Sequence, residues 1–281
     1  LFMIFNIFLL IFYNPIKNFI NIYDIPDSDR KNHKQKMPLL GGFLLYINLL
    51  FIFILSIYIE KSHFFDDMQN IDINKLSLLL GGTLFLLIGA ADDKYNLSPL
   101  IKLILFSIAI ILFISLDQNL VLKKLYISFL ERPLALNYLS MPITILCFLI
   151  LINALNMFDG IDLQLSLFSV QIFLYFIIIN ILPFYALGFL ISISFFCILN
   201  FRGKSFLGDN GSSLLAFIIG YLIINYYNEY SGNYFFSNKH FDGLYLNGLY
   251  VEQILIILLI PGLDMLRLFF NRILNKKNPF K

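Results

Sequence analysis

The chain has 281 residues, of which 59% are hydrophobic and only 14% charged, and its mean hydropathy is +0.81. Soluble domains carry about 25% charged residues, so this composition excludes a soluble globular enzyme. It also excludes a disordered protein, which would need low hydrophobicity and high charge. A net charge of +2 is too small to indicate nucleic acid as a partner. The two cysteines, Cys147 and Cys197, exclude a disulfide framework and lack metal-site spacing.

About nine apolar runs approach or reach the roughly 20 residues that a membrane-spanning helix needs. They cover residues 1–20, 39–59, 76–91, 98–116, 139–158, 163–181, 183–200, 212–227 and 250–270. Their apolar residues are continuous rather than alternating, so we predict an all-α polytopic integral membrane protein. We expect residues 1–281 to form one membrane-embedded domain that is clipped at both ends, with a natural gene that continues past Lys281.

The distribution of Lys and Arg predicts the orientation. Taking the polar stretches alternately, 14 of the 20 cations fall on one side of the membrane. Because cytoplasmic loops are enriched in Lys and Arg, we expect that side to be the cytoplasm. The polar stretches assigned to it are rich in Asp, Asn and Gly, whereas the external ones are plain polar loops.

Residues 24–42 read DIPDSDRKNHKQKMPLLGG. Arg30 and His33 precede a Pro38 to Gly42 turn, and the glycines there would let the backbone approach a bound anion. A plain positive-inside loop explains the cations equally well.

Residues 89–102 read GAADDKYNLSPLIK. Asp92 and Asp93 follow an apolar helix at its C-terminal end, where the helix dipole disfavours carboxylates and the two would repel each other. Ser98 and Pro99 then give the start signal of the next helix. Since stability does not explain the pair, we expect it to handle a cation or a proton at the membrane interface.

Residues 153–162 read NALNMFDGID. Asn153 and Asn156 are three residues apart, so they lie on one helical face. Asp159 and Asp162 follow at once, and the oxygens of Asn and Asp suit a hard cation such as Mg²⁺. Asn153 could instead make a hydrogen bond between helices.

Residues 202–213 read RGKSFLGDNGSS. Asp209 lies between two glycines, and we expect a helix that Ser212 caps to begin just after it. An Asp near a helix N-terminus is stabilising on its own. The nearby Arg202 and Lys204 favour instead a site for phosphate and metal.

In view of these four stretches and the closing RILNKKNPFK, the chain resembles the polyprenyl-phosphate N-acetylhexosamine-1-phosphate transferases, the glycosyltransferase family 4-like enzymes. The likeness runs from Asp24 to Lys281. The RKxHxxxxPxxGG loop looks like that of the bacterial undecaprenyl-phosphate GlcNAc-1-phosphate transferases. Two features depart from the family. Leu163-Gln164 stand where relatives have Gly-Leu, and the family's His-rich motif would follow the last residue here.

The resemblance implies transfer of an N-acetylhexosamine 1-phosphate from a UDP-sugar to a polyprenyl phosphate, with release of UMP, at the start of cell-envelope polysaccharide synthesis. It implies Mg²⁺ as cofactor, with Mn²⁺ as an alternative, and a multi-pass protein of the inner membrane with its site facing the cytoplasm. The oligomeric state stays open, with a dimer among the options. The implied residues are Asp92, Asp93 and Asp159 for catalysis, Asn156 and Asp209 for the metal, and Lys102, Gly160, Asp162, Arg30 and His33 for substrate binding.

Three other functions compete with this one. Intramembrane Asp and Asn residues also mark ion pathways of transporters, although the sequence shows neither the repeated halves nor the broken helices that many transporters have. Within the family, the activity could be that of the phospho-MurNAc-pentapeptide translocase. The altered Leu163 position and the missing His-rich motif leave room for a relative that binds lipid or nucleotide and turns over poorly.

Overall fold

A computed structural model describes residues 1–25, 36–61, 75–237 and 249–276. The described chain is helical apart from two small hairpins, which confirms the predicted all-α class. The helices are α1 (Phe2–Ile11), α2 (Tyr13–Ile20), α3 (Gly41–Lys61), α4 (Lys75–Tyr95), α5 (Pro99–Leu116), α6 (Ser140–Phe158), α7 (Gln164–Ile178), α8 (Pro183–Phe201), α9 (Gly208–Ser237), α10 (Val251–Ile257) and α11 (Leu259–Leu274).

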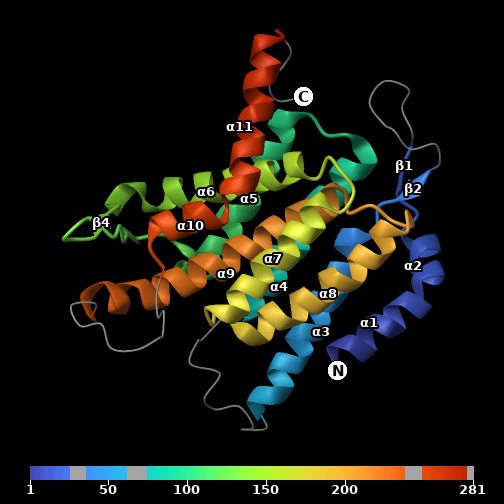
Figure 1. Cartoon of the computed structure of the whole chain (residues 1–281), viewed down its shortest axis with the longest axis horizontal. Helices are drawn as coiled ribbons and strands as arrows, with labels where there is room; N and C mark the ends of the chain where they lie inside the picture. Colours follow the sequence, from blue (N-terminus) through green and yellow to red (C-terminus); the bar gives the residue numbers. More distant parts are fainter. Residues whose placement is uncertain (26–35, 62–74, 238–248, 277–281) are drawn as a thin grey trace.

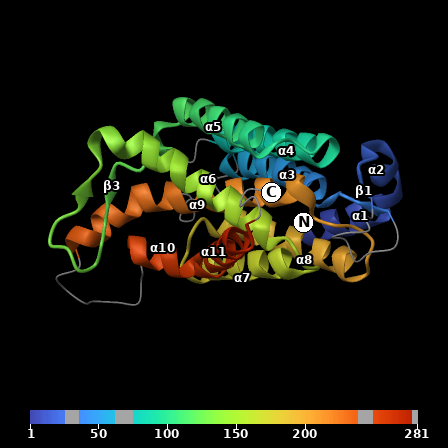
Figure 2. The same ribbon diagram turned by 90° about the horizontal axis from the view of Figure 1, so that it is seen from above.

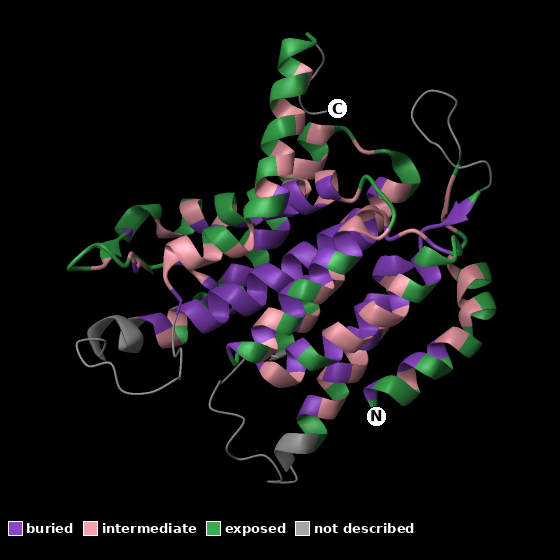
Figure 3. Cartoon of the chain, viewed as in Figure 1, coloured by how far each residue is buried: buried purple, intermediate pink, exposed green. Residues whose placement is uncertain are grey.

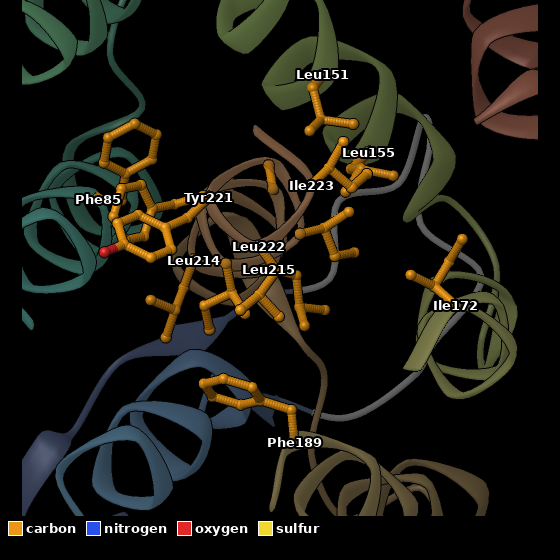
Figure 4. Close-up of a cluster of buried hydrophobic side chains, with 14 of the residues drawn as sticks. Phe85, Leu151, Leu155, Ile172, Phe189, Leu214, Leu215, Tyr221, Leu222 and Ile223 are labelled. Atoms are coloured by element: carbon orange, nitrogen blue, oxygen red, sulfur yellow. The ribbon is translucent and has the colours of Figure 1, made fainter. Parts of the chain in front are cut away.

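Helix α9 is the central element of the bundle (Figures 1 and 3). Its stretch from Leu214 to Tyr227 is buried throughout, and it packs against α3, α4 and α6. Figure 4 shows its side chains facing Phe85 of α4, Leu151 of α6 and Phe189 of α8. A helix that is apolar on every side belongs in the interior of a bundle, so the sequence of α9 explains its position.

Five helical segments are long and apolar enough to cross a membrane, or up to seven if each bent pair of helices is one span, within the described residues. The five correspond to the expected runs 39–59, 76–91, 98–116, 139–158 and 183–200. The expected count of about nine is not confirmed. The run 163–181 forms only the shorter helix α7, and the run 212–227 lies in α9, which does not pass the same criterion.

The two bent pairs correspond to the runs 1–20 and 250–270, for which the sequence analysis expected one helix each. Helices α1 and α2 meet at 66°, and α10 and α11 at 67°. Both breaks have the same cause. The first helix ends at Ile11, four residues before Pro15, and α10 ends at Ile257, four residues before Pro261. Proline removes a backbone donor and collides with the carbonyl four residues earlier, which breaks the helix there.

Two short antiparallel hairpins lie at opposite ends of the bundle (Figures 1 and 2). Strands β1 (Tyr23–Asp24) and β2 (Met37–Pro38) pair at one end, and β3 (Lys124–Leu125) and β4 (Leu134–Ala135) at the other. After β2, Leu39 forms a bridge with Phe206, directly before α9. The first hairpin is thereby joined to the N-terminal end of α9, where the candidate site lies.

Candidate active site

The polar ends of α4, α6 and α9 meet at the β1–β2 end of the bundle. A cavity of about 680 Å³ opens there. The residues that line it come from four separate parts of the chain: Asp24, Leu39, Asp92, Asp93, Asn96, Asn156, Asp159, Gly160, Ile161, Asp162, Asn200, Phe206, Leu207, Gly208 and Asp209. All four polar stretches that were expected on one side of the membrane, 24–42, 89–102, 153–162 and 202–213, contribute to this lining and therefore meet in space.

The side chain of Asp209, in the first turn of α9, contacts both α5 and α6. Its carboxylate accepts a hydrogen bond from the side-chain amide of Asn156 on α6, and its Oδ2 lies 3.4 Å from the Lys102 Nζ on α5. Burial acts to raise the pKa of Asp209, but the charge of Lys102 and the hydrogen bonds outweigh it and hold the pKa below its ordinary value. The lowered pKa favours the ionised form of Asp209, although its side chain is only partly exposed.

Lys102 also forms an ion pair with Asp92. The tight connection between α4 and α5 makes this contact: Ser98 caps α5, as expected, with its Oγ 3.4 Å from the amide nitrogen of Ile101. Lys102 then lies one turn into α5 and reaches back to the end of α4. Asp92 also accepts a hydrogen bond from the backbone N–H of Leu97 at 3.0 Å. The carboxylate is 93% buried, so its pairing with a cation is needed for ionisation.

Asp93, the next residue, faces α9. Its carboxylate accepts hydrogen bonds from the backbone N–H groups of Asp209, at 2.8 Å, and Asn210, at 3.0 Å, and from the Asn210 side chain. Helix α9 begins at Gly208, four residues before Ser212. The expectation that Ser212 caps this helix is therefore wrong, because Asp93 of α4 supplies the cap from a distant part of the chain.

Asn153 and Asn156 have different surroundings although both lie on α6. The Asn153 amide donates to the carbonyl of Leu149 in its own helix at 2.7 Å, and Asn153 does not line the cavity. Asn156 contacts Asp209 and also Ser212, at 3.2 Å. Of the two asparagines, only Asn156 contacts the site residues around Asp209. The hydrogen bond between helices that Asn153 could have made is instead a hydrogen bond within α6.

The turn after α6 forms another wall of the cavity. Asp159 ends α6, and Gly160 and Asp162 lie exposed at the cavity edge. Burial, followed by the charges of Asp209 and Asp93, raises the pKa of Asp159 well above its ordinary value. Since Asp159 sits among like charges, a cation in this cavity would stabilise its ionised form.

Asn200 fixes this turn and was not identified from the sequence. Its Oδ1 accepts the backbone N–H of Leu163 at 2.7 Å, and its Nδ2 donates to the carbonyl of Ser205 at 2.9 Å. The amide thus joins the turn after α6 to the loop before α9. A lone Asn at the end of an apolar run was the only available signal, and nothing in the sequence said which segment it would contact.

Leu163 has a φ of 67°, in the left-handed region that favours glycine. We predict that Leu163→Gly is more stable than Leu163→Ala by about 1 kcal/mol, because both lose the side chain but only glycine relieves the strain. The same pair of changes at Gln164, the first residue of α7, should give the opposite order. Thermal unfolding in detergent measures both, and a Leu163→Ala protein at least as stable as Leu163→Gly would contradict the strain.

The remaining expected site residues, Arg30 and His33, lie outside the described residues. For a metal, no group of three or more His, Cys, Asp or Glu side chains is arranged as a site within the described chain. Mg²⁺ is commonly held by one or two protein oxygens together with substrate phosphates. Asp209 and Asn156 fit that role, because both residues line a cavity that is rich in carboxylates. Two of these carboxylates, Asp92 and Asp209, pair with Lys102.

These features define a helical membrane protein with a buried acidic site at one end of its bundle. A family model described as glycosyl transferase family 4 matches residues 75–227, more than half of the chain. The chain belongs to this family. The matched range contains each of the expected site residues except Arg30 and His33.

Curated relatives agree with the family. A probable undecaprenyl-phosphate N-acetylglucosaminyl 1-phosphate transferase of Bacillus subtilis strain 168 is 28% identical over 137 residues, which are 48% of this chain and 34% of the relative. The undecaprenyl-phosphate alpha-N-acetylglucosaminyl 1-phosphate transferase of Escherichia coli O157:H7 is 27% identical over 233 residues, 79% of this chain and 59% of that protein. The protein of the same name from Yersinia pestis is 25% identical over 279 residues, which are 93% of this chain and 67% of that protein. The chain thus spans less than two thirds of the first two relatives.

Proposed function

We propose that the protein transfers an N-acetylhexosamine 1-phosphate, with GlcNAc-1-phosphate the first choice, from a UDP-sugar to a polyprenyl phosphate. The observation that carries the proposal is the cluster of Asp92, Asp209, Asn156 and Lys102 beside a cavity at the end of a bundle of apolar helices. A lipid phosphate and a water-soluble diphosphate can meet only at such a boundary between membrane and water. The names of the curated relatives support the acceptor and the transferred group.

In this reaction an oxygen of the lipid phosphate bonds to the β-phosphorus of the UDP-sugar. The bond from that phosphorus to the oxygen bridging the two phosphates breaks, and UMP leaves. Phosphoryl transfer depends mainly on positioning and on neutralising charge. In this proposal Lys102 would orient the diphosphate, and Asp92 would take the proton of a protonated lipid phosphate. Asp209 and Asn156 would hold Mg²⁺, which neutralises charge on the phosphates when bound.

We propose further that the site faces the cytoplasm of a bacterial inner membrane. The support is the charge distribution along the chain. Near the cavity end lie four cations: Lys36, Lys94, Arg202 and Lys204. At the β3–β4 end lie three: Lys123, Lys124 and Arg132. Since cytoplasmic loops carry the excess of cations, the cavity end is the cytoplasmic one.

An assay with UDP-[¹⁴C]GlcNAc, undecaprenyl phosphate and Mg²⁺ tests the activity on the purified protein in detergent. We expect radioactive lipid product that disappears when EDTA removes the metal. A transporter would bind ligand without forming a lipid product. If the protein instead prefers UDP-MurNAc-pentapeptide as donor, its activity is that of the translocase. If it binds the nucleotide but forms no lipid product, it is a relative that turns over poorly.

A further inference from the structure

One face of α4 packs closely against the first two turns of α9. Phe85, Gly89 and Asp93 are four residues apart and so lie in a row along α4. The hydroxyl of Ser213 donates to the Phe85 carbonyl at 3.1 Å. A Cβ at Gly89 would lie 2.5 Å from the carbonyl oxygen of Asp209, so only glycine permits this approach. The contacts hold the N-terminus of α9 at a fixed place on α4.

Asp93 is the last member of this row, and all its hydrogen bonds described above go to α9. Both carboxylate oxygens accept backbone N–H groups that have no partner within a helix. A negative charge at this position is also favoured by the helix dipole. Asp92, by contrast, turns toward Lys102 and the cavity. Adjacent carboxylates thus face different partners.

Asn210 completes the contact from the side of α9. It is fully buried, and its amide nitrogen donates to Asp93 and to the carbonyl of Leu39, at 3.3 Å for the latter. Its Oδ1 has no hydrogen-bond partner among the described residues. Because both neighbours of its nitrogen are acceptors, position 210 must supply a donor wherever position 93 supplies a carboxylate.

We infer that Asp93 is a positioning residue rather than a reacting group. Its carboxylate fixes the first turn of α9, which places the Asp209 side chain between Asn156 and Lys102. This inference rests on the proposed function for its activity measurement. Between the two side chains, positions 93 and 210 need one acceptor and one donor, and an exchange of the two residues keeps that single contact.

The test is an exchange of the two side chains. Asp93→Asn sets an amide against the amide of Asn210, and Asn210→Asp sets two carboxylates together. Each single variant is expected to lose at least about tenfold in transfer rate and to bind Mn²⁺ more weakly. In Asp93→Asn/Asn210→Asp the amide at 93 can donate to the new carboxylate and accept the N–H of Asp209. The exchange does not restore the hydrogen bonds to the Leu39 carbonyl and from the backbone N–H of residue 210. We therefore expect the double variant to recover part of the loss, with a rate at least about threefold above that of either single variant, as coupled neighbours do.

Three measurements on the purified protein decide the outcome: the rate of lipid-product formation, Mn²⁺ binding by paramagnetic resonance, and the midpoint of thermal unfolding. A double variant that unfolds and binds Mn²⁺ like the wild type but is as inactive as Asp93→Asn would overturn the inference, because the carboxylate itself would then react. A double variant that binds Mn²⁺ no better than the singles would overturn it as well. If the single variants do not fold, the double variant compared with the wild type still decides. If the wild type makes no product, the proposed activity fails, while Mn²⁺ binding and unfolding still test the positioning.

Discussion

Asp209→Ala is expected to lower the transfer rate by at least about a hundredfold, equivalent to about 2.7 kcal/mol of transition-state stabilisation. The change removes an oxygen ligand from the proposed metal and a carboxylate that pairs with Lys102 and Asn156. A metal that neutralises charge on transferring phosphate contributes several kcal/mol. The measurement is the initial rate at saturating Mg²⁺, with the amount of folded protein in the membrane determined alongside.

Glu131→Ala is the matched control for Asp209→Ala. Glu131 is exposed in the loop between β3 and β4, at the opposite end of the bundle, and its loss should leave the rate unchanged. An Asp209→Ala protein that keeps more than about a tenth of the wild-type rate, a loss below about 1.4 kcal/mol, would remove Asp209 from the metal site.

Asn156→Ala and Asn153→Ala form the second pair of variants, and the structure predicts very different effects for them. Asn156 contacts Asp209 and Ser212, so its loss should lower the rate by at least about thirtyfold, or about 2 kcal/mol. Asn153 bonds only within α6 among the described contacts, so its loss should change the rate by less than about threefold, within about 0.7 kcal/mol. The same assay measures both. Equal losses in the two variants would contradict the assignment of one amide to the site.

The helices of the bundle could be predicted from apolar runs, because a membrane forces the backbone into helices wherever the chain is apolar for long enough. The bends could have been predicted as well. Pro15 and Pro261 stand four residues after the ends of α1 and α10, and proline acts at that distance. Length and hydropathy alone treat such a run as one straight helix, which is why the prediction missed both bends.

The sequence could predict which residues come together at the site, but it could not predict which partner each of them contacts. Charge and amide residues at the ends of apolar helices indicate a shared interface, and Asp92, Asn156 and Asp209 do meet there. That Asp93 turns toward α9 while Asp92 turns toward Lys102 depends on how α4 packs against helices that follow it in the sequence. The cap on α9 joins residues 116 and 117 positions apart, and no local pattern specifies such a contact.

Gly89 is another residue whose role could not be predicted from the sequence. Within the sequence it is an ordinary glycine near the end of an apolar helix, and its importance follows only from the closeness of the Asp209 carbonyl and the Ser213 hydroxyl. Asn200 likewise acquires its role from the two loops that it joins. Contacts of this kind come from tertiary packing, which sequence patterns of period 3.6 do not describe.

We propose that the protein transfers a sugar together with its phosphate at the carboxylate cluster on the end of the bundle. The most direct measurement uses UDP-GlcNAc carrying ³²P only in the β-phosphate, with undecaprenyl phosphate and Mg²⁺, on the wild type and on Asp209→Ala. We expect the wild type to move ³²P into the lipid product and to release unlabelled UMP in equal amount. Asp209→Ala should do so at least about a hundredfold more slowly. Label that stays in the soluble nucleotide while sugar reaches the lipid, or equal rates in the two proteins, would contradict it.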